Sequence, residues 1–206
     1  ILSHIVEFRN GESGLHVLHI QTITEMLLRQ LVQKENNRYA LSKEQIRMIT
    51  TASALHDIGK ISIPDEILNK PGRLTAEEFA VIKGHSMAGA NMLSELPLDQ
   101  KEEPLVKTAY EICRWHHERY DGGGYPDGLK GEEIPVSAQV VALADVYDAL
   151  TSERCYKDAY SHEKAIEMIL AGQCGAFNPL MLECLLDISS SCLLYTSDAA
   201  DDMQCV

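Results

Sequence analysis

The chain has 206 residues, of which 45% are hydrophobic and 24% are charged, enough for one globular domain with a substantial core. Its net charge of −13 argues against binding to a nucleic-acid polymer, whose phosphates need positively charged partners. No run of about 18 apolar residues predicts a membrane span. The scattered cysteines, without a CxxC pair, indicate reduced thiols in a cytoplasmic protein.

The first predicted helix covers Gly14 to Lys34. Apolar residues recur there every three or four positions, and His16 falls on the same inward face, with His19 beside it. A second helix is expected to begin after the capping box Ser42–Gln45, to run through the His56-Asp57 pair and to stop at Gly59. The two prolines that follow predict a loop with at most one short helical turn.

Further helices are expected along the rest of the chain, each with a start signal of its own. They begin at the capping box Thr75–Glu78, at Pro104, at Ser137, at Ser161 and at Asn178-Pro179. Alternating strand patterns are missing, so we predict an all-α fold, a bundle of about six to eight helices, over residues 1–188. Residues 189–206 have neither periodicity nor caps, and we expect a tail of unknown or foreign origin.

Histidines and carboxylates recur on the inward faces or at the ends of these helices. A single inward histidine, such as His16 or His85, is more often a satisfied core residue than a ligand. Asp145 differs, because it interrupts a strongly apolar helix, where a carboxylate needs a cation or hydrogen-bond donors. The convergence of many such residues favours a metal centre, and its members are His16, His56, Asp57, His85, His116, His117 and Asp145.

This ligand set predicts both the kind of metal and the number of ions. Imidazole and carboxylate ligands without a thiolate motif suit iron, manganese or another octahedral divalent metal better than structural zinc. Seven ligands exceed what one ion needs. A bridging carboxylate such as Asp57 would hold two ions about 3.5–4 Å apart, an arrangement used for phosphate-ester displacement.

A glycine-rich loop follows the histidine pair His116-His117. Gly122 to Gly124 do not form a dinucleotide-binding fingerprint, because no strand precedes them and the spacing does not fit. The loop continues through Tyr125 and Pro126 to Pro135.

These motifs resemble the HD phosphohydrolase superfamily, and its HD-GYP subfamily in particular. The histidines, the segment His56 to Lys60 and Asp145 are similar to the superfamily's metal-site signature. The segment His117 to Pro135 resembles the extended HD-GYP motif, and the similarity covers about residues 7 to 188. His19 departs from the pattern, since many relatives carry arginine there. It could support a metal ligand or be a packed polar residue, and we expect the packed residue.

The resemblance implies an HD-domain helical bundle that hydrolyses cyclic di-GMP to linear pGpG, to GMP or to both, with two or three divalent ions, Fe or Mn. It implies the metal ligands Glu12, His16, His56, Asp57, His85, His116, His117 and Asp145. As a hypothesis, the substrate-binding residues are Lys60, Arg154, Lys157 and Tyr125. Asp57 and Lys60 would be catalytic. In the hypothesis, water activated between two ions attacks phosphorus in line with the departing 3′ oxygen.

Two alternatives stay open at this stage. One is an HD phosphohydrolase that acts on another cyclic dinucleotide or nucleotide. The other is a module that senses cyclic di-GMP or docks a partner domain without hydrolysis. A fused or partner signalling domain is typical of relatives, and a homodimer is also left open.

Overall fold

Helices make up all the regular structure of the part of the chain that the computed structural model describes, which is residues 6, 9, 15–152 and 159–189. The all-α prediction is therefore confirmed. The long helices are α2 (Leu15–Leu31), α3 (Lys43–Ser53), α5 (Ala76–Ser94), α7 (Pro104–Trp115), α8 (Val136–Thr151) and α9 (His162–Leu170), and residues 179–189 are helical as well. The short elements are η1 (Ile58–Ser62), α4 (Asp65–Leu68), α6 (Leu98–Lys101) and η2 (Gly131–Glu133).

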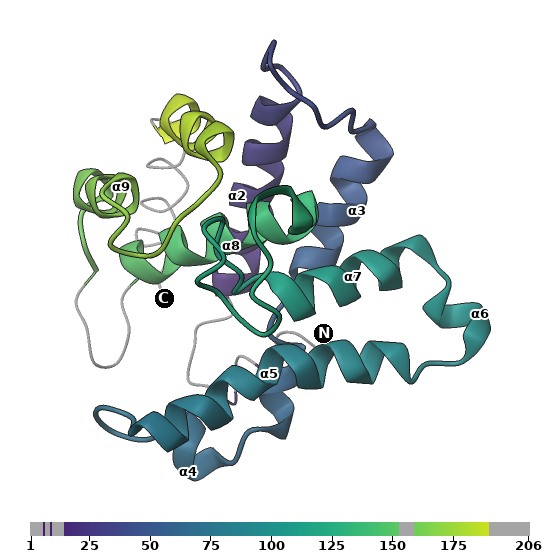
Figure 1. Cartoon of the computed structure of the whole chain (residues 1–206), viewed down its shortest axis with the longest axis vertical. Helices are drawn as coiled ribbons and strands as arrows, with labels where there is room; N and C mark the ends of the chain where they lie inside the picture. The colour runs from purple at the N-terminus through teal and green to yellow at the C-terminus, as the bar shows by residue number, and fades with distance from the viewer. Residues whose placement is uncertain (1–5, 7–8, 10–14, 153–158, 190–206) are drawn as a thin grey trace, which may run out of the picture.

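Helix α8 lies at the centre of the bundle (Figure 1), with α2, α7 and α9 packed against it. Its apolar sequence matches this position, because four consecutive residues, which point in different directions around the helix, are all buried: Val140, Val141, Ala142 and Leu143. Helix α3 packs against both α2 and α7, and α5 packs along α7 and against η1. These contacts bring the turn after α3, the middle of α5 and the end of α7 close to one another.

Most predicted helix starts are confirmed. Ser42 and Thr75 each accept a hydrogen bond from the backbone of the third helical residue, whose side chain bonds back to the cap, so both capping boxes form. Pro104 is the first residue of α7, and Ser161 caps α9. The prediction for Ser137 was wrong. Helix α8 begins at Val136 after Pro135, and the Ser137 hydroxyl instead donates to Glu111 at 2.8 Å.

The predicted end of the second helix was also wrong. Helix α3 ends at Ser53, so His56 and Asp57 lie in a turn that leads into η1 rather than inside a helix. Gly59 does not cap a helix. A Cβ atom at Gly59 would lie 1.9 Å from the carbonyl oxygen of His85, so glycine is needed because the backbone of η1 touches the backbone of α5.

Among the described residues, no helix has both the length and the apolar character that a membrane crossing requires. Among the described cysteines, Cys113 and Cys184 are free thiols. The predicted tail lies outside the described residues except for Ser189, which still belongs to the helix of residues 179–189. The domain boundary at residue 188 stays a prediction.

Candidate metal centre

All seven predicted ligands that the structure describes lie in two adjoining groups. Each group offers ligand atoms that lie within 4.8 Å of one another, which is the spacing that a single metal ion needs. The first group consists of Asp57, His85, His116 and His117, and the second consists of His16, His56 and Asp145. The sequence predicted these members but not their division into groups, which depends on how α2, α5, α7 and α8 pack.

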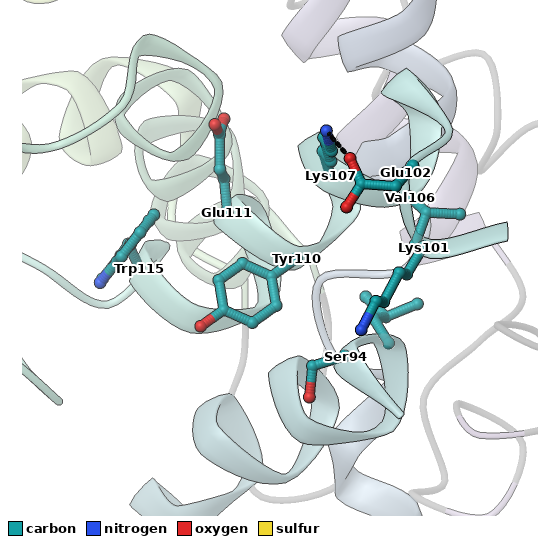
Figure 2. A pocket seen from close by; sticks show the side chains of 9 residues that line it. Ser94, Lys101, Glu102, Val106, Lys107, Tyr110, Glu111 and Trp115 are labelled. Atoms are coloured by element: carbon teal, nitrogen blue, oxygen red, sulfur yellow. Dashed lines mark hydrogen bonds and ion pairs between the residues drawn. The ribbon is translucent and has the colours of Figure 1, made fainter. Parts of the chain in front are cut away.

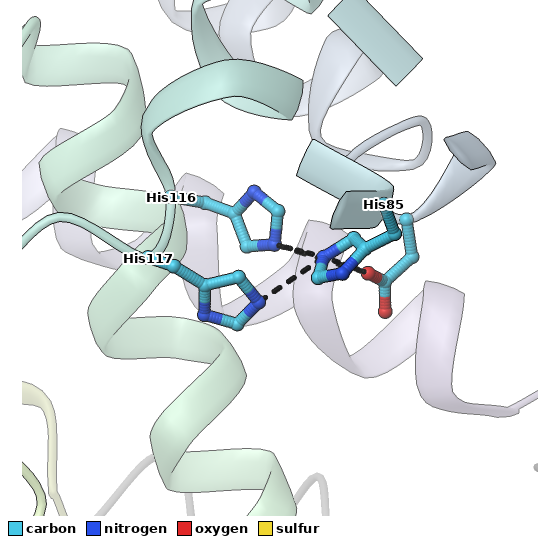
Figure 3. Close-up of side chains that lie close together, drawn as sticks. His85, His116 and His117 are labelled. Atoms are coloured by element: carbon cyan, nitrogen blue, oxygen red, sulfur yellow. Dashed lines mark hydrogen bonds and ion pairs between the residues drawn. The ribbon is translucent and has the colours of Figure 1, made fainter. Parts of the chain in front are cut away.

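In the first group, three imidazoles point at one another. Figure 3 shows the rings of His116 and His117 directed at the ring of His85. The Nε2 atom of His85 is 3.4 Å from Nε2 of His116 and 3.2 Å from Nε2 of His117. Histidine side chains from the middle of α5 and from the end of α7 thus meet at one point.

Backbone carbonyls determine which ring nitrogen is available. Nδ1 of His85 lies 2.7 Å from the carbonyl oxygen of Ile82, and Nδ1 of His116 lies 2.8 Å from that of Ile112. Nδ1 of His56 likewise faces a carbonyl in the preceding turn, at 2.9 Å. Since a carbonyl oxygen only accepts, Nδ1 carries the proton in each ring, and Nε2 of the neutral ring presents a lone pair to the centre.

Asp57 has one carboxylate oxygen on each side of the centre. Oδ1 lies 3.1 Å from Nε2 of His85, in the first group, and Oδ2 lies 3.2 Å from Nε2 of His56, in the second. The ammonium group of Lys60 is 2.6 Å from Oδ2. This carboxylate therefore has the orientation that a bridge between two ions would need.

The donor atoms pass a test of fit for bound cations. Nε2 of His56 and Oδ1 of Asp57 are buried and have no hydrogen-bond partner, although other ring nitrogens and oxygens lie close. Buried polar atoms are rarely left unsatisfied, and a cation that takes nitrogen and oxygen ligands would satisfy both. We conclude that the cluster suits divalent metal ions.

The titration behaviour of these groups reflects burial and crowding. Burial would lower the pKa of His56, but the charge of Asp57 raises it to about 9. Burial and the neighbouring His56 lower the pKa of His116 to about 3. Burial disfavours charge on Asp57, yet Lys60 and His56 hold its pKa well below the usual value. In the first group, a neutral His116 ring therefore lies next to the ionised carboxylate of Asp57.

The sequence did not single out Asp148, which holds His16 in place. Its buried carboxylate lies 2.6 Å from Nδ1 of His16 and 2.7 Å from Nδ1 of His19. His19 is therefore tied to the centre through this acid rather than only packed. The signal that could have indicated this role is the spacing of Asp148 three residues after Asp145, which places both on one side of α8.

Beside the centre, the glycine-rich loop supplies a ring and an anchor. The ring of Tyr125 stacks on that of His117, with centroids 4.8 Å apart, and the ammonium group of Lys83 lies 5.5 Å from the Tyr125 ring centre. Glu118 is 2% exposed, and its carboxylate accepts hydrogen bonds from three successive backbone amides that begin at Asp127. The loop thus forms a wall of the candidate site.

A separate pocket of about 340 Å³ opens between the end of α5 and α7 (Figure 2). Apolar side chains such as Val106, Tyr110 and Trp115 line part of it, and the labelled residues include no predicted ligand. The chemistry that the sequence predicts therefore does not belong to this pocket. Glu12, Arg154 and Lys157 lie outside the described residues, so their predicted roles stay predictions.

Comparison with known proteins connects this geometry to a family. A family model described as HD domain matches residues 11–177. The chain belongs to the HD domain family. The resemblance to HD proteins, which was predicted from the histidine and aspartate motifs, is thereby confirmed.

Two curated proteins that are similar to this HD-domain chain have sequence identities of 42% and 39% to it. A Vibrio cholerae protein named "Probable cyclic di-GMP phosphodiesterase" is 42% identical over 191 residues, which cover 90% of this chain and 42% of that protein. A Xanthomonas campestris protein named "Cyclic di-GMP phosphodiesterase response regulator RpfG" is 39% identical, over 90% of this chain and 46% of that protein. The chain thus spans less than half the length of these relatives.

A solved structure supports the fold. It is described as an HDG"Y"P protein from Bdellovibrio bacteriovorus, with a TM-score of 0.62 and 22% identity, over 84% of this chain and 51% of that chain. The HD-domain chain therefore shares its helical fold with about half of that protein.

Proposed function

We propose that this HD-domain chain is a metal-dependent phosphodiesterase that hydrolyses cyclic di-GMP to linear pGpG, to GMP or to both. The observation that carries the proposal is the position of Asp57, whose two carboxylate oxygens face two separate groups of ligand atoms. Two divalent ions held there would supply Lewis-acid activation of a water molecule and of a phosphate. The names of relatives at 42% and 39% identity support cyclic di-GMP as the substrate.

The chain's own residues have distinct tasks in this proposal. Asp57 and the histidines hold the ions, and Asp57 also lies 2.6 Å from the ammonium group of Lys60. A phosphate oxygen that enters the centre would lie beside the ammonium group of Lys60, which also contacts Asp57. The contact with Asp57 would keep this ammonium group next to the reacting phosphate. Tyr125, stacked on His117, would limit how a base or ribose lies against the centre.

A second substrate is favoured by a specific observation. A Vibrio cholerae relative named "3'3'-cGAMP-specific phosphodiesterase 2" is 39% identical over 90% of this chain, almost as similar as the proteins named for cyclic di-GMP. The motifs seen here are therefore compatible with a purine other than guanine in one half of the substrate. The identity of the metal as Fe or Mn, a third ion, a cytoplasmic location, a fused signalling domain and a homodimer stay predictions.

The test is a cleavage assay with purified protein. Wild type and Asp57→Ala would each be incubated with Mn²⁺ or Fe²⁺ and with cyclic di-GMP or 3′3′-cGAMP, and the products separated by chromatography. We expect metal-dependent cleavage by wild type and none by Asp57→Ala, with the helical circular dichroism spectrum retained. Cleavage by Asp57→Ala at close to the wild-type rate would disprove the assignment, and binding without cleavage by wild type would favour a sensor module.

A further inference from the structure

Asp148 receives hydrogen bonds from two imidazoles at once. It lies on α8, one turn after Asp145, and is 1% exposed. Oδ2 is 2.6 Å from Nδ1 of His16, Oδ1 is 2.7 Å from Nδ1 of His19, and the Ser152 hydroxyl donates to Oδ1 at 2.9 Å. Three donors, two from α2 and one from the residue that follows α8, thus face this buried carboxylate.

This arrangement determines how His16 meets the second ligand group. An ionised carboxylate only accepts, so the Nδ1 atom of His16 carries its proton, and Nε2 of the neutral ring has a lone pair. That Nε2 atom lies 4.0 Å from Oδ1 of Asp145, inside the second group. Asp148 therefore selects both the tautomer and the direction of the His16 ring.

His16 differs in this respect from the other ligand histidines. His56, His85 and His116 are oriented by backbone carbonyls, which no substitution of a side chain removes. Among the described ligand histidines, His16 is the one whose Nδ1 atom meets a side-chain carboxylate. A change at position 148 should therefore affect the second group and leave the first group intact.

We propose that Asp148 is a positioning residue for the second metal ion, acting through His16. The inference rests on the proposed function, since it assumes one ion in each ligand group. A carboxylate that accepts from the non-ligating nitrogen of a histidine fixes the ring and makes the ligating nitrogen more basic. Loss of such a partner typically weakens metal binding about 10–100-fold.

The experiment measures binding of Mn²⁺ to the full chain after removal of bound metal, by calorimetry and by metal analysis after desalting. We expect wild type to bind two ions. Asp148→Asn keeps the shape of the side chain but not its charge, and Asp148→Ala removes the acceptor. Both variants should bind one ion with wild-type affinity and the other about 10–100-fold more weakly.

A matched control is Asp127→Asn. Asp127 also accepts from three side-chain donor groups, two on Arg114 and one on Trp115, but contacts no imidazole of the described residues. This variant should bind both ions as wild type does. A second readout is the tautomer of the neutral His16 ring by nitrogen-15 NMR of the metal-free chain, recorded at a pH at which the ring has lost its second proton. We expect Nδ1–H in wild type and a mixture of tautomers in Asp148→Ala.

The outcomes separate the two proposals. Two ions of unchanged affinity in both Asp148 variants would overturn the positioning role and leave the proposed function standing. Loss of both ions together, or of the helical fold, would show that Asp148 is merely structural, which also overturns it. A wild-type chain that binds fewer than two Mn²⁺ ions would contradict the proposed function itself.

Discussion

The carboxylate of Glu118 accepts a hydrogen bond from the backbone amide of Asp127 at 2.7 Å, although nine positions separate the two residues. The amides of Gly128 and Leu129 donate to the same side chain at 3.1 Å each. Glu118 directly follows His117, so a residue next to a candidate ligand holds the far side of the glycine-rich loop. The position of Tyr125, between these two points, depends on this anchor.

Glu118→Gln should loosen the loop. One oxygen would remain for Asp127 and Gly128, but the new amide group would face the amide of Leu129, and two donors cannot bond to each other. An unsatisfied buried donor costs about 1–3 kcal/mol. We expect the free energy of unfolding in urea to fall by about this amount and KM for the cyclic dinucleotide to rise.

A neighbouring glutamate gives the control. Glu133 accepts one backbone amide, that of Lys130 at 2.9 Å, in an exposed position. Glu133→Gln should change the free energy of unfolding by less than about 0.5 kcal/mol, as is usual for surface substitutions. Equal losses in the two variants would contradict the anchoring role of Glu118.

Gly59→Ala should separate η1 from α5. The added Cβ atom would lie 1.9 Å from the carbonyl oxygen of His85 and 2.5 Å from the backbone nitrogen of Gly89, and neither can move as a side chain does. Overpacking of this kind costs about 1–3 kcal/mol or more. Because Asp57 directly precedes η1 and His85 lies on α5, the change would push these two ligands apart, and Mn²⁺ binding should weaken together with thermal stability.

Gly84→Ala is the matched control on the same helix. No atom lies within 4 Å of a Cβ built at Gly84, which is inside α5. Alanine is favoured over glycine inside a helix by about 0.5–1 kcal/mol, so this variant should be as stable as wild type or more stable. A Gly59→Ala chain with wild-type melting temperature and Mn²⁺ affinity would show that the contact between η1 and α5 is not tight.

Helix periodicity and caps were enough to predict which residues face the centre, but not how they are held. His85 and Asp145 could be identified because a polar residue on an apolar face is visible in the sequence. The end of α3 at Ser53 could not be predicted from the sequence, since it depends on the contact of Gly59 with α5. Asp148 was missed for a related reason, because its partners lie more than a hundred residues away in α2.

Arg9→Lys should destabilise η1. The guanidinium group of Arg9 donates to the carbonyl oxygens of Lys60, Ile61 and Ile63 and also to the carboxylate of Asp65. A lysine ammonium cannot reach four acceptors along this path, because it lacks the planar fork of arginine. We expect the free energy of unfolding to fall by about 1–3 kcal/mol, since carbonyls are left without donors.

The control for that change is Arg29→Lys on α2. Arg29 is exposed and its side chain pairs, among the described residues, with Glu25 one turn earlier, a contact worth about 0.3–0.5 kcal/mol. Urea unfolding of both variants would compare them directly. A loss no larger for Arg9→Lys than for Arg29→Lys would rule out the stabilising role of Arg9.

Binding of the second ion should release protons from His56 and His16. Burial would lower the pKa of His56, but the charge of Asp57 raises it to about 9, so the metal-free chain holds this proton at pH 7.5. Burial also opposes the charge on His16, but the hydrogen bond to Asp148 raises its pKa. Both Nε2 atoms must lose any proton before they can bind a cation, so affinity should rise with pH until about 9 and then level off.

The same raised pKa makes a separate contribution to stability without metal. The folded chain binds the His56 proton more tightly than the unfolded chain, whose histidine titrates near the ordinary value of 6.5. This stabilisation is fully present below pH 6.5 and is lost as the pH rises through about 9. The stability of the metal-free chain should therefore fall with rising pH, whereas that of the metal-bound chain should rise.

The protons that the second ion releases can be counted. Calorimetric titration with Mn²⁺ in buffers of different ionisation enthalpy would give their number, and we expect about one to two. An affinity for the second ion that is constant between about pH 6.5 and 8.5 would show that His56 is not one of its ligands.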